Sequence, residues 1–130
     1  MNFQVGQKAS FSKTITETDV YQFAGICGDF NPVHTNAVEA EKSIFGKQVA
    51  HGMLGASLIS TVLGTKLPGP GTIYIGQNLK FRSPVYFGDT LCATVEIKEL
   101  QPRGRAVLNA VVVNQKDEVV IEGEAVVKLP

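Results

Sequence analysis

Hydrophobic and polar residues alternate along the second half of the chain. In residues 90–98 every second side chain is predicted to face inward, namely Leu91, Ala93, Val95 and Ile97. Residues 119–129 repeat the alternation, with an inward set of Val119, Ile121, Gly123, Ala125, Val127 and Leu129. This period is typical of strands with one buried face. Residues 72–82 and 105–114 are predicted as two further strands, with turns at 101–104 and 115–117.

The first half of the chain predicts a strand at residues 8–15, followed by a helix. Thr16 and Asp19 have the spacing of a helix-capping pair. The apolar side chains that follow recur at helical spacing, namely Val20, Phe23, Ala24 and Cys27. Gly28 is predicted to end this helix, because glycine accepts the left-handed conformation found just beyond helix ends.

Proline and asparagine punctuate the next segment. Residues 29–34 are predicted to form a loop, because Pro32 prevents a simple continuation of the helix. Asn36, with a glutamate three residues later, predicts the cap of a short helix over residues 37–44. Gly46 would close that helix.

A helix without charge is predicted over residues 52–64, since no charged residue follows until Lys66. Such a helix must be surrounded by protein. Its small residues would let other backbone approach closely, and residues 68–71 (Pro-Gly-Pro-Gly) would end it. One apolar helix beside antiparallel strands with one apolar face predicts an α+β fold, in which a curved sheet wraps around the helix.

Composition narrows the classes of function. The 130 residues fit a single domain over 1–130, and the 44% hydrophobic fraction is that of a globular protein. Twelve basic and twelve acidic residues cancel, which argues against nucleic acid as a partner. The longest apolar segment, 53–63, is too short to span a membrane, and residues 1–6 show no secretory signal, so a cytoplasmic location is expected.

Candidate acid–base residues lie in the segment 28–36, where Asp29 and His34 flank a proline. Asp29 alone could cap a helix or a turn, and His34 could be a loop histidine with a structural hydrogen bond. The rigid Asn31–Pro32 step, however, would fix the two side chains relative to each other, as acid–base catalysis requires.

His51 and Gly52 stand at the start of the uncharged helix. The first turn of a helix has unpaired N–H groups and a partial positive charge, so it can stabilise a developing enolate oxygen. Gly52 would let a ligand carbonyl approach that backbone. His51 could set the entry of the chain into the helix or hydrogen-bond to a main-chain carbonyl. A metal site formed with Asp29 and His34 is not expected, because no i, i+4 ligand pair is present.

Five segments together resemble one known family: residues 28–34, 49–53, 77–81, 84–89 and 123–130. They are similar to the (R)-specific enoyl-CoA hydratases of the MaoC-like dehydratase group, in particular the short bacterial enzymes that feed polyhydroxyalkanoate synthesis. The resemblance implies a hot-dog fold, in which a curved antiparallel sheet encloses a long central helix. It also implies a homodimer that needs no cofactor.

The resemblance implies a role for particular residues. Asp29 and His34 would be the catalytic pair, the Gly52 N–H would contribute to the oxyanion hole, and Asn31 would belong to the substrate-binding group. Ser60 matches the serine that the family has on its central helix, and Ser57 is the weaker candidate. The implied reaction is the reversible (R)-specific hydration of trans-2-enoyl-CoA to (3R)-hydroxyacyl-CoA.

Three other functions fit the same fold. A (3R)-hydroxyacyl-acyl-carrier-protein dehydratase would run the reaction in reverse with the same pair of residues. A thioesterase would hydrolyse the thioester, although the Asp-x-Asn-Pro-x-His order argues against it. A non-catalytic acyl-CoA-binding module would have no use for Asp29 and His34 together.

Overall fold

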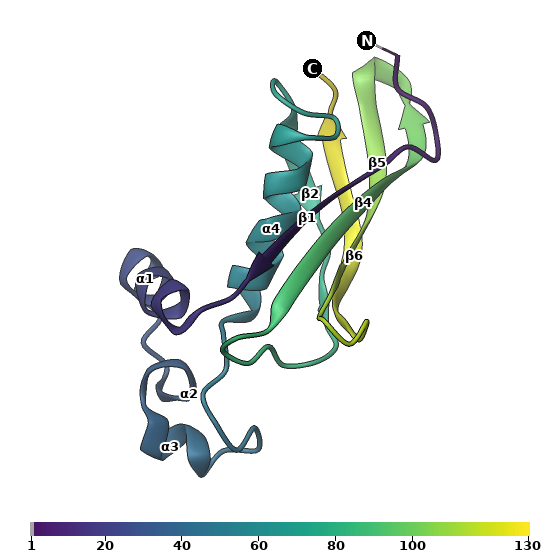
Figure 1. The fold of residues 1–130 in the computed structure, drawn as a ribbon. Coiled ribbons are helices and arrows are strands. Elements are labelled where there is room, and N and C mark those ends of the chain that lie inside the picture. The colour runs from purple at the N-terminus through teal and green to yellow at the C-terminus, as the bar shows by residue number, and fades with distance from the viewer. Residues whose placement is uncertain (1) are drawn as a thin grey trace.

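One helix lies along a strongly curved antiparallel sheet in this protein (Figure 1). The structure is a computed structural model and describes residues 2–130. Its elements are β1 (Lys8–Thr14), α1 (Glu17–Cys27), α2 (Pro32–Thr35), α3 (Ala37–Glu41), α4 (Gly52–Thr65), β2 (Ile73–Gln77), β3 (Lys80–Phe81), β4 (Thr90–Gln101), the 3₁₀ turn η1 (Pro102–Gly104), β5 (Arg105–Val113) and β6 (Val119–Lys128). The helices α1, α2 and α3 lie together at one end of α4, away from most of the sheet.

The strands form one six-stranded sheet in the order β1-β4-β5-β6-β2, and β3 pairs with β6 beside β2. All pairings are antiparallel. The core lies between this sheet and α4, and its largest fully buried side chains include Ile59, Leu63, Leu91, Ile97, Leu108 and Ile121. The prediction of an α+β fold with a sheet wrapped around an apolar helix is confirmed.

The inward alternation predicted for β4 is confirmed, but that of β6 changes phase near its start. Val120 and Ile121 are both buried, whereas Val119 is only partly buried. The cause is a register shift, because the consecutive residues Val112 and Val113 of β5 pair with Ile121 and Val119, which leaves Val120 of β6 as an extra residue. A bulge of this kind inserts one extra residue and turns the side chains that precede it.

Local signals set the ends of α1 as predicted. The Thr16 side chain accepts a hydrogen bond from the Asp19 N–H at 3.1 Å, and the Asp19 carboxylate accepts one from the Thr16 N–H at 2.9 Å. Gly28 ends the helix in the left-handed conformation, with φ of 82°. Asp29 therefore follows a helix end whose position the sequence fixes locally.

Two predicted boundaries in this region are wrong. Residues 29–34 are not all loop, because Pro32 begins the short helix α2, where a missing N–H and a fixed φ are tolerated. The helix that starts after Asn36 ends at Glu41 rather than at residue 44. The Ser43 hydroxyl donates to the carbonyl of Ala40 at 2.6 Å, which satisfies one of the last helical carbonyls.

The prediction of one continuous strand over residues 72–82 is also wrong, because the segment is divided into β2 and β3. Asn78 lies between them and its carbonyl oxygen approaches Gly123 on β6, where an added Cβ would lie 1.9 Å from that oxygen. Only glycine permits this approach.

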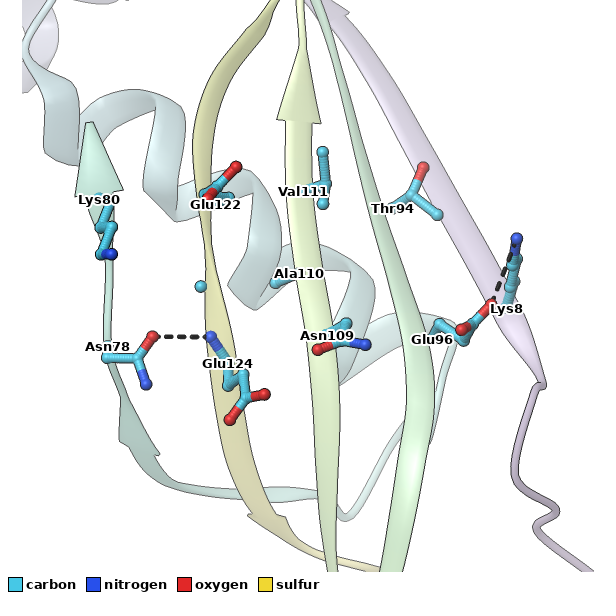
Figure 2. Close-up of a pocket in the computed structure, with 11 residues that line it drawn as sticks. Lys8, Asn78, Lys80, Thr94, Glu96, Asn109, Ala110, Val111, Glu122 and Glu124 are labelled. Carbon is cyan, nitrogen blue, oxygen red and sulfur yellow. Dashed lines mark hydrogen bonds and ion pairs between the residues drawn. The ribbon is translucent and has the colours of Figure 1, made fainter. Parts of the chain in front are cut away.

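The surfaces of the sheet and of α4 differ in polarity. The sheet face turned away from α4 carries charged and amide side chains, among them Lys8, Glu96, Glu122 and Glu124, around a shallow hollow of about 550 Å³ (Figure 2).

The prediction that protein covers α4 on every side is wrong for the single chain, because Met53, Ser57 and Ser60 are exposed. None of the helices in residues 2–130 has the length and apolar character needed to cross a membrane.

Candidate active site

His34 lies in α2 and its ring is almost buried, with 9% of its surface exposed. Its Nδ1 lies 2.7 Å from the carbonyl oxygen of Val49. Because a carbonyl oxygen can only accept a hydrogen bond, Nδ1 carries the proton, and Nε2 of the neutral ring keeps a free lone pair. The Val49 N–H in turn donates to the Val33 carbonyl at 3.0 Å. The ring is thus held in one orientation with Nε2 available for proton transfer.

Asp29 lies on the exposed turn between α1 and α2. Its Oδ1 accepts a hydrogen bond from the Asn31 N–H at 3.1 Å. The Asn31 side chain accepts one from the Val33 N–H at 3.3 Å and caps α2. Within residues 2–130 no group hydrogen-bonds to Asp29 Oδ2, so this oxygen can bind a substrate or a water molecule.

His51 joins this pair. One ligand atom of each of Asp29, His34 and His51 lies within 4.8 Å of the others. The rings of the two histidines are stacked, with centroids 3.8 Å apart and planes inclined by 27°. The predicted acid–base pair is therefore close in space, at a separation that one bridging water molecule can span.

These three residues also invite a test for a metal ion. Imidazole binds a metal along its ring plane through a nitrogen lone pair. One ring nitrogen of each histidine is already engaged by a main-chain carbonyl, His34 Nδ1 by that of Val49 and His51 Nε2 by that of Asp29. The expectation of no metal stays a prediction.

A cavity of about 620 Å³ opens beside His34. It is lined by Asn31, Gly52 and a set of mainly apolar residues from distant segments, among them Phe45, Met53, Phe81, Val85 and Ile121. Gly52 is the first residue of α4, and the His51 side chain makes no capping hydrogen bond there. Gly52 and Met53 at this helix start line the same cavity as His34, and the first N–H groups of a helix have no partner within the helix.

Ser60 lies in another hollow. Together with Ser57 and Tyr74 it lines a cavity of about 540 Å³, and Met53 lines both cavities. The Ser57 hydroxyl donates to the Leu54 carbonyl of its own helix at 2.5 Å. Within the single chain the structure thus brings Asp29, His34, Asn31 and Gly52 together but not Ser60, whose role stays a prediction.

Sequence reasoning missed the apolar wall of the cavity. Phe45 follows α3 and Phe81 lies in β3, so no periodic pattern in the sequence links these two residues to His34. The available signal was the segment 77–81, which supported the family resemblance but was given no site role.

Comparisons with known proteins agree with this picture. The MaoC like domain family matches residues 2–120. The chain is 50% identical to an (R)-specific enoyl-CoA hydratase of Rhodospirillum rubrum over 96% of this chain and 87% of that protein. It is 46% identical to a 3-hydroxybutyryl-CoA dehydratase of Methylorubrum extorquens over 99% of this chain and 82% of that protein.

The fold has a solved counterpart. The structure of the (R)-hydratase of Aeromonas caviae involved in PHA biosynthesis matches with a TM-score of 0.95 and 43% identity, covering 98% of each chain. The resemblance seen in the sequence is thereby confirmed. The chain belongs to the MaoC-like domain family.

Proposed function

We propose that this protein catalyses the reversible, (R)-specific hydration of trans-2-enoyl-CoA to (3R)-hydroxyacyl-CoA. The observation that carries the proposal is that the Asp29 carboxylate lies next to His34, and that His34 and Gly52 line one largely apolar cavity. The names of the relatives, an enoyl-CoA hydratase and a hydroxyacyl-CoA dehydratase, describe the two directions of this one reaction.

The chemistry follows from the thioester. Its carbonyl can accept charge as an enolate, which makes C3 of the double bond electrophilic. A water molecule held between Asp29 Oδ2 and His34 Nε2 adds its oxygen to C3. One of the two groups takes a proton from this water, and a proton is delivered to C2, so the net change is the addition of one water molecule.

The N–H groups at the start of α4 supply the remaining element. An enolate oxygen placed at Gly52 would accept hydrogen bonds from the helix start, which also bears a partial positive charge. No electrons are gained or lost overall, so the reaction requires no redox cofactor. The apolar wall of the cavity suits the acyl chain.

The proposal extends to the assembly and its setting. We propose that residues 1–130 act as one domain and that two copies form a homodimer in the cytoplasm, supplying (3R)-hydroxyacyl units for polyhydroxyalkanoate synthesis. The exposed faces of α4 and β2 support the dimer, because a helix without charge is otherwise left uncovered.

Incubation with crotonyl-CoA tests the function. We expect the absorbance of the enoyl thioester to fall without release of free thiol, and chiral analysis to identify the (3R) product. Release of thiol would indicate a thioesterase instead, and binding without turnover would indicate an acyl-CoA-binding module. Faster turnover of the matching acyl-carrier-protein substrate would assign the protein to the dehydratases of fatty-acid synthesis.

A further inference from the structure

His51 is a buried titratable residue that the proposed mechanism leaves without a task. Only 3% of its surface is exposed. Its Nε2 lies 2.8 Å from the main-chain carbonyl oxygen of Asp29. Its Nδ1 is buried and has no hydrogen-bond partner among the described residues.

These contacts fix the proton on one nitrogen of the ring. The Asp29 carbonyl oxygen can only accept, so Nε2 of His51 carries a hydrogen. A second hydrogen on Nδ1 would be a buried N–H without an acceptor, which is unfavourable. The contacts of His51 thus select a hydrogen on Nε2, whereas the contact of His34 with Val49 selects a hydrogen on Nδ1.

The ring of His51 is fixed on its faces as well. His34 stacks against it with a centroid distance of 3.8 Å, and the Phe23 ring packs nearby with its centroid at 5.0 Å. One side chain thus contacts both members of the acid–base pair: the main chain of Asp29 through a hydrogen bond and the ring of His34 through stacking.

We infer that His51 is a positioning residue that sets the separation of Asp29 from His34, a role that rests on the proposed hydratase function. The turn that carries Asp29 is exposed, and the contact with His51 ties it to the rigid start of α4. Without the contact, the carboxylate and the imidazole no longer hold one water molecule in a reactive geometry. Misplacement of a catalytic group by about 1 Å can cost about 100-fold in rate.

Two substitutions separate the contacts of His51. His51→Phe keeps an aromatic ring for stacking but removes the hydrogen bond to Asp29. His51→Gln keeps a side-chain donor and removes the stacked ring. We expect kcat for crotonyl-CoA to fall about 10- to 100-fold in His51→Phe with KM within about twofold of the wild type, and to recover in part in His51→Gln.

A core substitution provides the matched control. Ile59 is fully buried in α4 and contacts the sheet, so Ile59→Val lowers stability without touching the cluster. Its kcat should equal that of the wild type. Turnover by His51→Phe within twofold of the wild type, or a change confined to KM, would overturn the inference.

Nitrogen NMR of the wild type gives a readout that does not depend on turnover by a variant. The chain has only two histidines, so uniform ¹⁵N labelling gives two ring systems. We expect one ring protonated at Nδ1 and the other at Nε2, and His51→Gln assigns them by removing the second. Protonation of His51 at Nδ1 would overturn the inference. An inactive wild type would overturn the proposed function, whereas equal activity of His51→Phe and an active wild type would overturn only the role of His51.

Discussion

The Nδ1 atom of His34 lies 2.7 Å from the carbonyl oxygen of Val49, in the segment that leads directly into α4 at Gly52. The same segment is anchored to the loop between β3 and β4, because the Ala50 N–H donates to the Val85 carbonyl at 2.8 Å. The His34 imidazole and the first N–H groups of α4 are therefore both held by the segment 49–51. In the proposed reaction this keeps the proton-transfer group and the oxyanion donors at a fixed spacing.

Gly52 and Phe81 should be energetically coupled. A Cβ at position 52 would lie 2.7 Å from two atoms of the Phe81 ring, which is half exposed and can move outward. We expect Gly52→Ala to lower the free energy of unfolding by about 1 kcal/mol, at the low end of overpacking costs. In a Phe81→Ala background the same substitution should cost less, as measured by urea denaturation. Equal costs in both backgrounds would contradict the contact.

Ser60 is predicted to orient the substrate, and Ser57 is its natural control. Loss of one hydrogen bond to the bound substrate corresponds to about 0.5–1.5 kcal/mol, so Ser60→Ala should lower kcat/KM by about 2- to 10-fold. Ser57→Ala should leave it unchanged, because the Ser57 hydroxyl is already engaged by the Leu54 carbonyl. Steady-state kinetics with crotonyl-CoA measure both. Identical kcat/KM for Ser60→Ala and the wild type would remove Ser60 from the site.

The cap of α1 should make the free energy of unfolding depend on pH. The hydrogen bond from the Thr16 main chain, followed by that from Lys13, holds the pKa of Asp19 below its ordinary value of 3.8. A carboxyl with a lower pKa in the folded state stabilises the fold above the unfolded-state pKa and loses this contribution as pH falls through the folded-state pKa. Asp19→Asn should therefore destabilise the protein at pH 7 and approach the wild type below about pH 3.8.

Urea denaturation at pH 7 and at pH 3 checks whether the stability deficit of Asp19→Asn shrinks as the pH falls. Thr16→Ala, which removes the other half of the cap, should cost about 1 kcal/mol at pH 7. Glu41→Gln is the control, because Glu41 is exposed and has no ion pair among residues 2–130. A deficit of Asp19→Asn that grows on acidification would contradict the assignment.

The edge strand β2 should carry the dimer contact. Ile73, Tyr74 and Ile75 expose 57%, 39% and 45% of their surface, beside the uncovered face of α4. A lysine buried in an apolar interface is costly, so Ile75→Lys should raise the dimer dissociation constant at least tenfold, as measured by light scattering. Leu100→Lys is a matched control at the far end of β4, with 42% exposure in the wild type. A monomeric wild type would contradict the proposed homodimer.

Local signals explain how much of the fold could be predicted from the sequence. The ends of α1 depend on Thr16, Asp19 and Gly28, which act within a few residues, and they were placed correctly. The prediction of a loop at residues 29–34 treats Pro32 as a helix breaker, but a proline at the first helical position is favourable and begins α2. The phase of β6 depends on a register shift against β5, which no pattern within one strand reveals.

In the candidate site, too, contacts within one short segment could be predicted from the sequence, whereas contacts between distant segments could not. The proximity of Asp29 and His34 could be anticipated, because they lie within one short segment that a proline stiffens. The bond from His51 to the Asp29 carbonyl joins positions distant in sequence, and the apolar wall combines residues from α3's end to β6. Such contacts depend on how the helices pack at the end of α4, which local sequence does not encode.

The most direct test of the central claim is the turnover number for crotonyl-CoA in Asp29→Asn and in His34→Ala, with circular dichroism to verify folding. If the two side chains share the water molecule that adds to C3, each substitution should lower kcat by about 10²- to 10⁴-fold while the fold is retained. A folded variant of either kind that turns over crotonyl-CoA at a near-normal rate would contradict the account.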